Sequence, residues 1–240
     1  MSLIKQLINF NSSRVRLREV NASFAEIVPN NALILDAGAG KQPYRDLFAH
    51  ACYESADFEM VDKEYAPPTY SCDLKAIPCE DGRFDFVLLN QVMEHLPDPL
   101  AVLQELNRVL KDGGKLFYTA PFFYEEHEQP YDFYRYTQFG IKELFTKAGL
   151  RIEKIEWLEG YFGTMAYQLN RMSKHIPLSP SKINLGILGL LFSPFFFVLK
   201  VFFFALSLLF HWVETKTKYT GGGYPKNYMA IATKIRKTTV

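Results

Sequence analysis

The sequence has few cysteines and almost no net charge, and both absences narrow the kinds of protein it can be. Its three cysteines, Cys52, Cys72 and Cys79, are odd in number and lack CxxC spacing. They therefore indicate neither a disulfide framework nor a zinc finger. A formal net charge of +1 gives no overall attraction to nucleic acid. No run of metal-ligating residues stands out either, so we expect no metal site and no nucleic-acid partner.

The N-terminal stretch lacks the apolar run of a secretory signal peptide, which favours a location on the cytoplasmic side. A length of 240 residues suits one α/β domain with an additional segment. The sequence is instead rich in aromatic residues, which make up 15% of the chain and include 21 phenylalanines. Many of these phenylalanines lie in one late stretch, and that stretch needs its own explanation.

The best-defined motif covers residues 33–44, with the sequence LILDAGAGKQPY. A short apolar run is followed by Asp36, and Gly38 and Gly40 then enclose one small residue. This pattern predicts a buried strand, a tight glycine turn and the start of a helix. In an open α/β sheet, such a turn lies at the carboxyl end of a strand, where bare backbone can approach a nucleotide-like ligand.

Two common nucleotide-binding motifs are excluded at this turn. A dinucleotide site has the pattern GxGxxG, but Pro43 occupies the position of the third glycine. Asp36 would repel a pyrophosphate, although it could pair with an ammonium group. The turn also lacks the GK[ST] sequence of a phosphate-binding P-loop. The ligand is therefore expected to be nucleotide-like but without a pyrophosphate.

The remainder of the first 160 residues alternates between strand and helix patterns, which predicts a doubly wound, mostly parallel sheet. Asp57 ends the second predicted strand about 20 residues past the glycine turn, where an acid can bind ribose hydroxyls. Glu59 is a competing candidate for that role. Strands are expected at 53–58, 70–74, 84–90, 115–120, 151–158 and 228–235, and helices at 14–28, 43–51, 100–110 and 137–148.

Four stretches together resemble the class I S-adenosylmethionine-dependent methyltransferases, in particular the type 11-like small-molecule group. They are residues 35–44, Asp57, residues 73–99 and residues 103–121. The resemblance covers roughly residues 33–160 and implies a Rossmann-like sheet whose last strand is antiparallel. It also implies S-adenosylmethionine as the cofactor and methyl transfer to a small-molecule acceptor.

The resemblance assigns cofactor-binding residues by their positions. The glycine turn and Asp36 would hold the amino-acid end, and Asp57 would bind the ribose. Asp73 and its neighbour would flank the adenine, and Gln91 and its neighbour would line the sulfonium end. The full set is Asp36, Gly38, Ala39, Gly40, Asp57, Phe58, Asp73, Leu74, Asn90 and Gln91.

Methyl transfer to a hydroxyl needs a base, and histidine suits this role near neutral pH. The candidate catalytic residues are His127 and His95, although a structural or solvated role is the more common explanation for each. Further candidates for the base are Glu94, Tyr131 and Asp132. Aromatic residues between positions 122 and 136 form either a substrate wall or a lid on the sheet. The substrate-contact candidates are Phe123, Tyr131 and Tyr134.

Residues 183–213 form a mostly apolar stretch that contains one lysine, Lys200, and one proline, Pro194. The stretch exceeds the ~18–20 residues that span a bilayer. A single crossing would separate the last strand from its sheet, so we exclude it. Three arrangements remain: a re-entrant hairpin broken near residues 194–200, helices in the membrane interface, or a cap on the domain or on a partner. We favour peripheral or monotopic membrane association on the cytoplasmic side, with a lipid-like or membrane-borne acceptor.

The expected domain organisation is a helical segment (1–30), a cofactor-binding core (31–160), a hydrophobic insert (161–226) and a final strand (227–240). The rival function is a non-catalytic binding protein that keeps the cofactor fold, or a membrane-anchored scaffold. The sequence makes no prediction of the oligomeric state.

Overall fold

The computed structural model describes residues 13–58, 64–179, 182, 186 and 188–235. The chain divides into two compact units. The sheet unit comprises the described residues of Arg16–Leu158 and Asn227–Val240, and the helical unit comprises those of Met1–Val15 and Glu159–Lys226. Glu59, the competing ribose candidate, lies outside the described residues.

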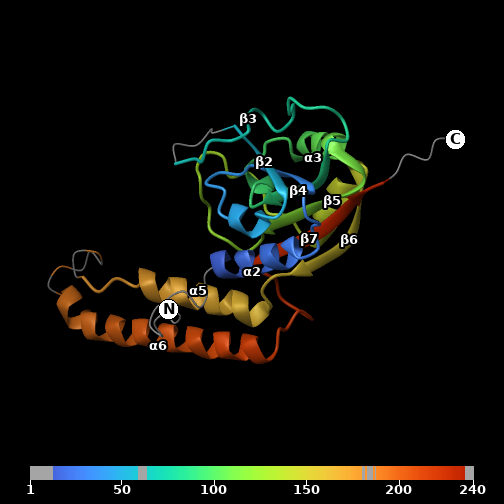
Figure 1. The fold of residues 1–240 in the computed structure, drawn as a ribbon. Coiled ribbons are helices and arrows are strands. Elements are labelled where there is room, and N and C mark those ends of the chain that lie inside the picture. The colour runs from blue at the N-terminus through green and yellow to red at the C-terminus, as the bar shows by residue number, and fades with distance from the viewer. Residues whose placement is uncertain (1–12, 59–63, 180–181, 183–185, 187, 236–240) are drawn as a thin grey trace. The chain divides into compact units, whose positions relative to one another are not determined.

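The sheet unit contains a seven-stranded sheet with the order β3-β2-β1-β4-β5-β7-β6 (Figure 1). Strand β7 is antiparallel to both β5 and β6, and the other neighbouring pairs are parallel. This topology confirms the predicted fold class. The strands are β1 (Leu33–Ala37), β2 (Cys52–Asp57), β3 (Tyr70–Ser71), β4 (Phe84–Asn90), β5 (Leu110–Pro121), β6 (Leu150–Trp157) and β7 (Asn227–Lys234).

Helices cover both faces of the sheet because its central strands are apolar on both sides. Leu88 of β4 belongs to the core beneath α2 (Ser13–Ala25), whereas its neighbour Val87 packs in the core that includes α3 (Pro99–Val109) and α4 (Gln138–Lys147). On the α2 face, Phe24 stacks on Phe117 of β5 with ring centroids 4.6 Å apart. The helix expected at 14–28 is confirmed as α2, although it ends at Ala25.

Two predicted elements are shorter in the structure. The helix expected at 43–51 is a single 3-10 turn, η1 (Arg45–Phe48), and the strand expected at 70–74 is the two-residue β3. In η1, Leu47 N–H bonds to Tyr44 O (2.9 Å) and Ala51 N–H bonds to Phe48 O (3.0 Å). Phe48 is fully buried. Its side chain belongs to the same core as Ile34 and Leu88, so this short connection packs against the sheet.

The strand expected at 115–120 is longer in the structure, because α3 ends at Val109 and β5 begins at Leu110. A Cβ atom on Gly114 would lie 2.8 Å from the Lys111 carbonyl oxygen and 3.0 Å from the Asp85 carbonyl oxygen. The register between β4 and β5 also shifts here. Gly114 is therefore required by close backbone approach within the sheet rather than by a helix end.

The helical unit contains α5 (Tyr161–His175) and α6 (Leu188–Lys216), which lie side by side (Figure 1). Helix α6 is continuous through Pro194, so the helix lacks the break near residues 194–200 that the re-entrant alternative required. Pro194 lies in the second turn of a 29-residue helix. There the loss of one backbone hydrogen bond leaves most of the helix intact.

Two charged residues of α6 contact opposite ends of α5. The Glu214 carboxylate accepts hydrogen bonds from Gly160 N–H (2.6 Å) and Gly163 N–H (3.0 Å) at the start of α5. Lys200 Nζ donates to the Lys174 carbonyl oxygen (3.3 Å) in the last turn of α5. An acid at the N-terminus and a base at the C-terminus both complement the helix dipole, so these contacts hold the helix pair together.

We predict that Glu214→Gln lowers the free energy of unfolding by about 1–2 kcal/mol, because it removes a charge-assisted cap from two backbone N–H groups. Urea unfolding followed by circular dichroism measures the loss. The matched control is Glu143→Gln on α4, whose side chain is 65% exposed in an ion pair with Lys147. The control should change stability by less than about 0.5 kcal/mol. Equal effects of the two substitutions would contradict the capping role.

Candidate functional site

The glycine turn after β1 has a backbone conformation that depends on its two glycines. Gly38 and Gly40 have φ angles of +74° and +52°. A Cβ atom on Gly38 would lie only 2.5 Å from the Val92 side chain, whereas one on Gly40 would meet nothing within 4 Å. Gly40 N–H donates to Asp57 Oδ2 (2.8 Å), so the acid at the end of β2 fixes the turn. The turn therefore presents bare backbone at the carboxyl edge of the sheet.

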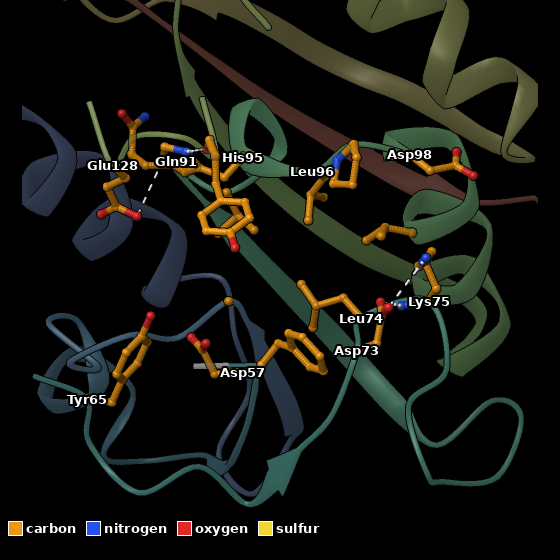
Figure 2. Close-up of a pocket in the computed structure, with 16 residues that line it drawn as sticks. Asp57, Tyr65, Asp73, Leu74, Lys75, Gln91, His95, Leu96, Asp98 and Glu128 are labelled. Carbon is orange, nitrogen blue, oxygen red and sulfur yellow. Dashed lines mark hydrogen bonds and ion pairs between the residues drawn. The ribbon is translucent and has the colours of Figure 1, made fainter. Parts of the chain in front are cut away.

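A cavity of about 320 Å³ opens beside this turn (Figure 2). Its volume falls at the small end of the ~300–1,000 Å³ range of ligand sites. It lies at the carboxyl edge of the sheet, and its wall continues into the loops that follow β2, β3 and β4. Six of the predicted cofactor residues line it: Gly38, Asp57, Phe58, Asp73, Leu74 and Gln91.

Four other predicted cofactor residues lie outside the described wall of the cavity: Asp36, Ala39, Gly40 and Asn90. Asn90 exchanges amide hydrogen bonds with Asn21 of α2 (3.0 and 3.1 Å) and accepts one from Thr119 Oγ1 (3.0 Å). Asp36 is only 3% exposed and accepts a hydrogen bond from the Tyr53 hydroxyl. These side chains hold the strand ends in place beside the cavity, and their direct contact with the cofactor stays a prediction.

Burial raises the pKa of Asp36 to about 6. The unfolded chain ionises this carboxyl near pH 4, so the unfolded state loses its proton first as the pH rises. We therefore predict that the contribution of Asp36 to the free energy of unfolding falls as the pH rises from about 4 to about 6. Above that range this contribution stays constant. Urea unfolding of the wild type and Asp36→Asn across this range tests it. The variant should lack this part of the fall, and identical pH profiles would contradict the prediction.

Gln91 lies at the opposite end of the cavity from Asp57, the last residue of β2. It follows β4 with a φ angle of +55°, and its backbone N–H donates to the Thr119 carbonyl oxygen (2.8 Å). Its side-chain Nε2 is buried and has no hydrogen-bond acceptor within the described part of the chain. A buried donor in a cavity wall fits a polar ligand, because leaving such a group unpaired is costly.

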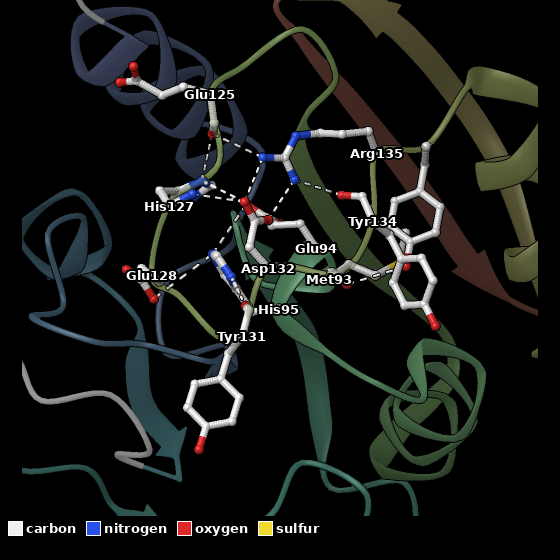
Figure 3. Close-up of polar contacts among 11 residues, drawn as sticks. Met93, Glu94, His95, Glu125, His127, Glu128, Tyr131, Asp132, Tyr134 and Arg135 are labelled. Atoms are coloured by element: carbon white, nitrogen blue, oxygen red, sulfur yellow. Dashed lines mark hydrogen bonds and ion pairs between the residues drawn. The ribbon is translucent and has the colours of Figure 1, made fainter.

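The loop after β4 and the loop 122–136 bring an acid and two histidines together (Figure 3). Glu94 and His95 lie in the 3-10 turn η2 (Met93–His95), and His127 approaches from the second loop. The rings of His95 and His127 pack edge to face, with centroids 4.8 Å apart. Burial raises the pKa of the Glu94 carboxyl to about 8. His95 lines the cavity, while His127 lies behind it and outside the described wall.

An ion pair secures the second loop. Arg135 Nη1 contacts Asp132 Oδ1 (2.6 Å) and Arg135 Nη2 contacts Asp132 Oδ2 (2.8 Å), and the arginine holds the pKa of Asp132 at about 2. Asp132 also accepts a hydrogen bond from His127 N–H (2.9 Å). Asp132, a further candidate for the base, is thus committed to holding the loop. Sequence reasoning missed Arg135, which lies among ordinary loop residues.

The three predicted substrate residues have different positions. Tyr131 lines the cavity. Tyr134 is 41% exposed and its hydroxyl donates to the Pro97 carbonyl oxygen (3.3 Å), and Phe123 is 38% exposed. Neither of these two belongs to the described cavity wall. Glu128, which no sequence pattern distinguished from its acidic neighbours, does line it.

Comparisons with known proteins agree with this geometry. Residues 35–118 match the family described as "Methyltransferase domain". Demethylmenaquinone methyltransferase of Staphylococcus haemolyticus is 31% identical over 93 residues, which cover 36% of each chain. Ubiquinone biosynthesis O-methyltransferase of Xanthomonas oryzae is 47% identical over 38 residues, which cover 16% of each chain. The chain thus spans far less than two thirds of these curated relatives.

The fold has a full-length counterpart among solved structures. A SAM-dependent methyltransferase from Archaeoglobus fulgidus superposes with a TM-score of 0.54 at 16% identity, covering 97% of this chain and 98% of that one. At this identity the likeness concerns the fold alone.

The cavity residues fit S-adenosylmethionine. The strand-end acid Asp57 suits ribose hydroxyls, apolar Phe58 and Leu74 suit an adenine ring, and the buried Nε2 of Gln91 suits a polar group at the other end. At Gly38 a Cβ atom would clash with the Val92 side chain, which also lines the cavity, so this glycine preserves the shape of the cavity wall. Residues 35–118 thus form a methyltransferase domain, and the cavity beside them fits the cofactor of the class I S-adenosylmethionine-dependent group that they resemble.

Proposed function

We propose that this protein transfers a methyl group from S-adenosylmethionine to a small-molecule acceptor. The observation that carries the proposal is the composition of one cavity, which has the glycine turn and Asp57 at one end and Gln91, His95 and Tyr131 at the other. When bound, the cofactor supplies an electrophilic methyl group on a sulfonium. The protein then has to hold and align the two reactants. Correct alignment can remove a large part of the barrier to such a displacement.

We further propose that the acceptor is lipid-like and borne by a membrane. Helix α6 supports this, because its most apolar 18-residue window has a mean hydropathy of 2.1 and is only 6% buried. Large apolar side chains are exposed along it, including Leu190, Leu191, Phe195, Phe197, Val198 and Phe202. A contiguous apolar surface of this kind marks an interaction site. The names of the two matched relatives, from menaquinone and ubiquinone biosynthesis, also favour an apolar acceptor.

The charges of the helical unit are arranged in a way that suits a bilayer surface. Lys200 and Glu214 form hydrogen bonds with the two ends of α5. The outer surface of α6 between residues 188 and 213 is therefore apolar. Basic residues lie near the ends of the helix pair, where they can contact anionic lipid headgroups. They are Arg171, Lys174, Lys182, Lys216 and Lys218.

The sheet limits how α6 can meet a membrane. Leu158 N–H donates to the Asn227 carbonyl oxygen (2.9 Å), so the two ends of the inserted segment 159–226 are neighbours. A single crossing by α6 would separate these ends. Helix α5 has only 15 residues, about 22 Å, and cannot cross back. We therefore propose that α6 lies in the plane of the interface, with its apolar surface among the acyl chains.

Methyl-labelled S-adenosylmethionine tests the function and the acceptor class together. The full chain is incubated with cell extract and labelled cofactor, and the products are separated into organic and aqueous phases. We expect label in the organic phase, and a strong reduction with Asp57→Ala. Label only in the aqueous phase would contradict the lipid-like acceptor. Cofactor binding without any transferred label would favour the rival function, a non-catalytic binding protein.

A further inference from the structure

We propose that Glu94, His95 and His127 form a binding site for a divalent transition-metal cation of the Zn²⁺ class. No sequence pattern indicates this site, because His127 lies 32 positions after His95 and neither residue belongs to a metal-binding motif. The folded chain brings one potential ligand atom of each residue within 4.8 Å of the others. Two imidazoles and one carboxylate are a ligand set that zinc uses with a fourth position left open.

The buried carboxylate of Glu94 is the first observation that points to a ligand. Its side chain is 0% exposed, and within the described residues neither of its oxygens accepts a hydrogen bond. Its carbonyl oxygen accepts from Phe133 N–H (2.9 Å) and Tyr134 N–H (3.3 Å), which fixes the backbone of this residue. A buried carboxylate without hydrogen bonds is strongly unfavourable unless it takes up a proton or binds a cation.

The orientation of the two histidines is the second observation. His95 Nδ1 lies 2.5 Å from the Tyr131 carbonyl oxygen, so Nδ1 carries the proton and donates it. The Nε2 lone pair of His95 then faces the acids, 3.7 Å from Glu94 Oε1 and 3.9 Å from Glu128 Oε2. Metal-binding histidines characteristically donate their second ring N–H to a carbonyl or carboxylate, and the Tyr131 carbonyl serves that role here.

His127 is held in a similar way. Its Nδ1 lies 3.1 Å from the Glu125 carbonyl oxygen and 3.4 Å from Asp132 Oδ2. Asp132 is itself fixed by Arg135, so the ring has a rigid support. These contacts orient the imidazole in the way that an outer-shell carboxylate orients a ligand.

The cluster needs only a modest contraction to hold the ion. Zinc lies about 2.0–2.2 Å from nitrogen and oxygen ligands, which puts neighbouring ligand atoms roughly 3.4 Å apart in a tetrahedron. The 3.7 Å between His95 Nε2 and Glu94 Oε1 is already close to this value. The remaining contraction falls on His127, whose side chain is 28% exposed and so less enclosed than that of Glu94. Glu128 Oε2 is near enough to His95 to serve as a further ligand.

The site gives the two histidines a role different from the general base expected from the sequence. His95 and Glu128 line the cavity, so a bound cation would lie in its wall. It could take an oxygen of the acceptor as an additional ligand and lower the pKa of a hydroxyl there. This last consequence rests on the proposed function, whereas the site itself does not.

Metal binding can be measured without activity. Full-length, untagged protein is freed of metal by chelation and dialysis, then titrated with Co²⁺ while its visible absorption is recorded, and with Zn²⁺ by calorimetry. We expect one equivalent to bind, with the intense visible bands of a four- or five-coordinate Co²⁺ centre. Glu94→Gln and His127→Gln should each weaken Zn²⁺ binding at least 10-fold. His50→Gln and Glu143→Gln, which lie outside the cluster, should leave it unchanged.

The outcomes are distinguishable from failure of folding and of the proposed function. S-adenosylmethionine titration of each variant checks that the cavity is intact, and it does not depend on methyl transfer. No stoichiometric binding by the wild type would overturn the site and indicate that Glu94 holds a proton instead. Binding that is equally strong in the folded Glu94→Gln and His127→Gln variants would also overturn it, because the ion would then lie elsewhere.

Discussion

Replacing Gly38 with alanine is expected to abolish measurable binding of S-adenosylmethionine, whereas Gly40→Ala should retain most of it. Both glycines have positive φ angles, which cost about 1–2 kcal/mol for an L-residue. Only at Gly38 does the new Cβ atom also meet a neighbour, 2.5 Å from the Val92 side chain. Overpacking of this kind adds about 1–3 kcal/mol. The two substitutions therefore separate backbone strain from steric displacement of the cavity wall.

Calorimetric titration and urea unfolding of the two variants provide the measurement. The double variant Gly38→Ala with Val92→Ala should recover part of the lost stability, because it removes the two closest atoms from the path of the new methyl group. Equal effects of Gly38→Ala and Gly40→Ala would show that the contact with Val92 does not restrict which side chain residue 38 can carry. Such a result would remove the geometric basis for assigning this wall to the cofactor.

Replacing three exposed side chains of α6 is expected to release the protein from membranes. Leu191, Val198 and Phe202 are 72%, 64% and 55% exposed. Full burial of one such side chain is worth about 1.5–3 kcal/mol. We assume that membrane insertion provides half of this burial energy. Replacing all three residues with serine then removes about 2–4 kcal/mol from the free energy of partitioning, which lowers the partition coefficient at least about 25-fold.

Flotation with vesicles of phosphatidylcholine and phosphatidylglycerol measures the partitioning. The matched control is Phe139→Ser on α4, whose side chain is also 72% exposed but belongs to the sheet unit. The control should float as the wild type does. If wild type and triple variant both remain with the soluble fraction, or if both float equally, α6 is not the membrane contact.

The elements predicted well from the sequence are those whose neighbours in the chain determine them. Strand β4 has the predicted bounds, Phe84–Asn90, because a continuous apolar run suits only a strand buried on both faces. The helix expected at 137–148 forms as α4, and Thr137 caps it, with its hydroxyl accepting a hydrogen bond from Gly140 N–H (3.2 Å). The glycine turn and Asp57 likewise follow from local spacing and from the position rule for parallel sheets.

The elements predicted poorly depend on contacts between distant parts of the chain. The segment after Pro43 has helical composition, yet it forms one 3-10 turn that packs against the sheet through the buried Phe48. The apolar stretch predicted a helix, but the contacts of Lys200 and Glu214 with the two ends of α5 arise only from the antiparallel pairing. The meeting of Glu94 with His127 requires both loops to be folded, so spacing along the sequence gave no indication of it.

The central claim is that the cavity beside the glycine turn binds S-adenosylmethionine, and calorimetric titration of the full chain tests it most directly. The wild type should bind one equivalent. Asp57→Ala should weaken binding by about 10- to 150-fold, because it removes a charged hydrogen-bond acceptor worth about 1.5–3 kcal/mol. Asp81→Ala, at a side chain that is 81% exposed and outside the cavity, should bind as the wild type does. A wild-type chain that binds no cofactor, or an Asp57→Ala variant that binds it equally well, would contradict this account.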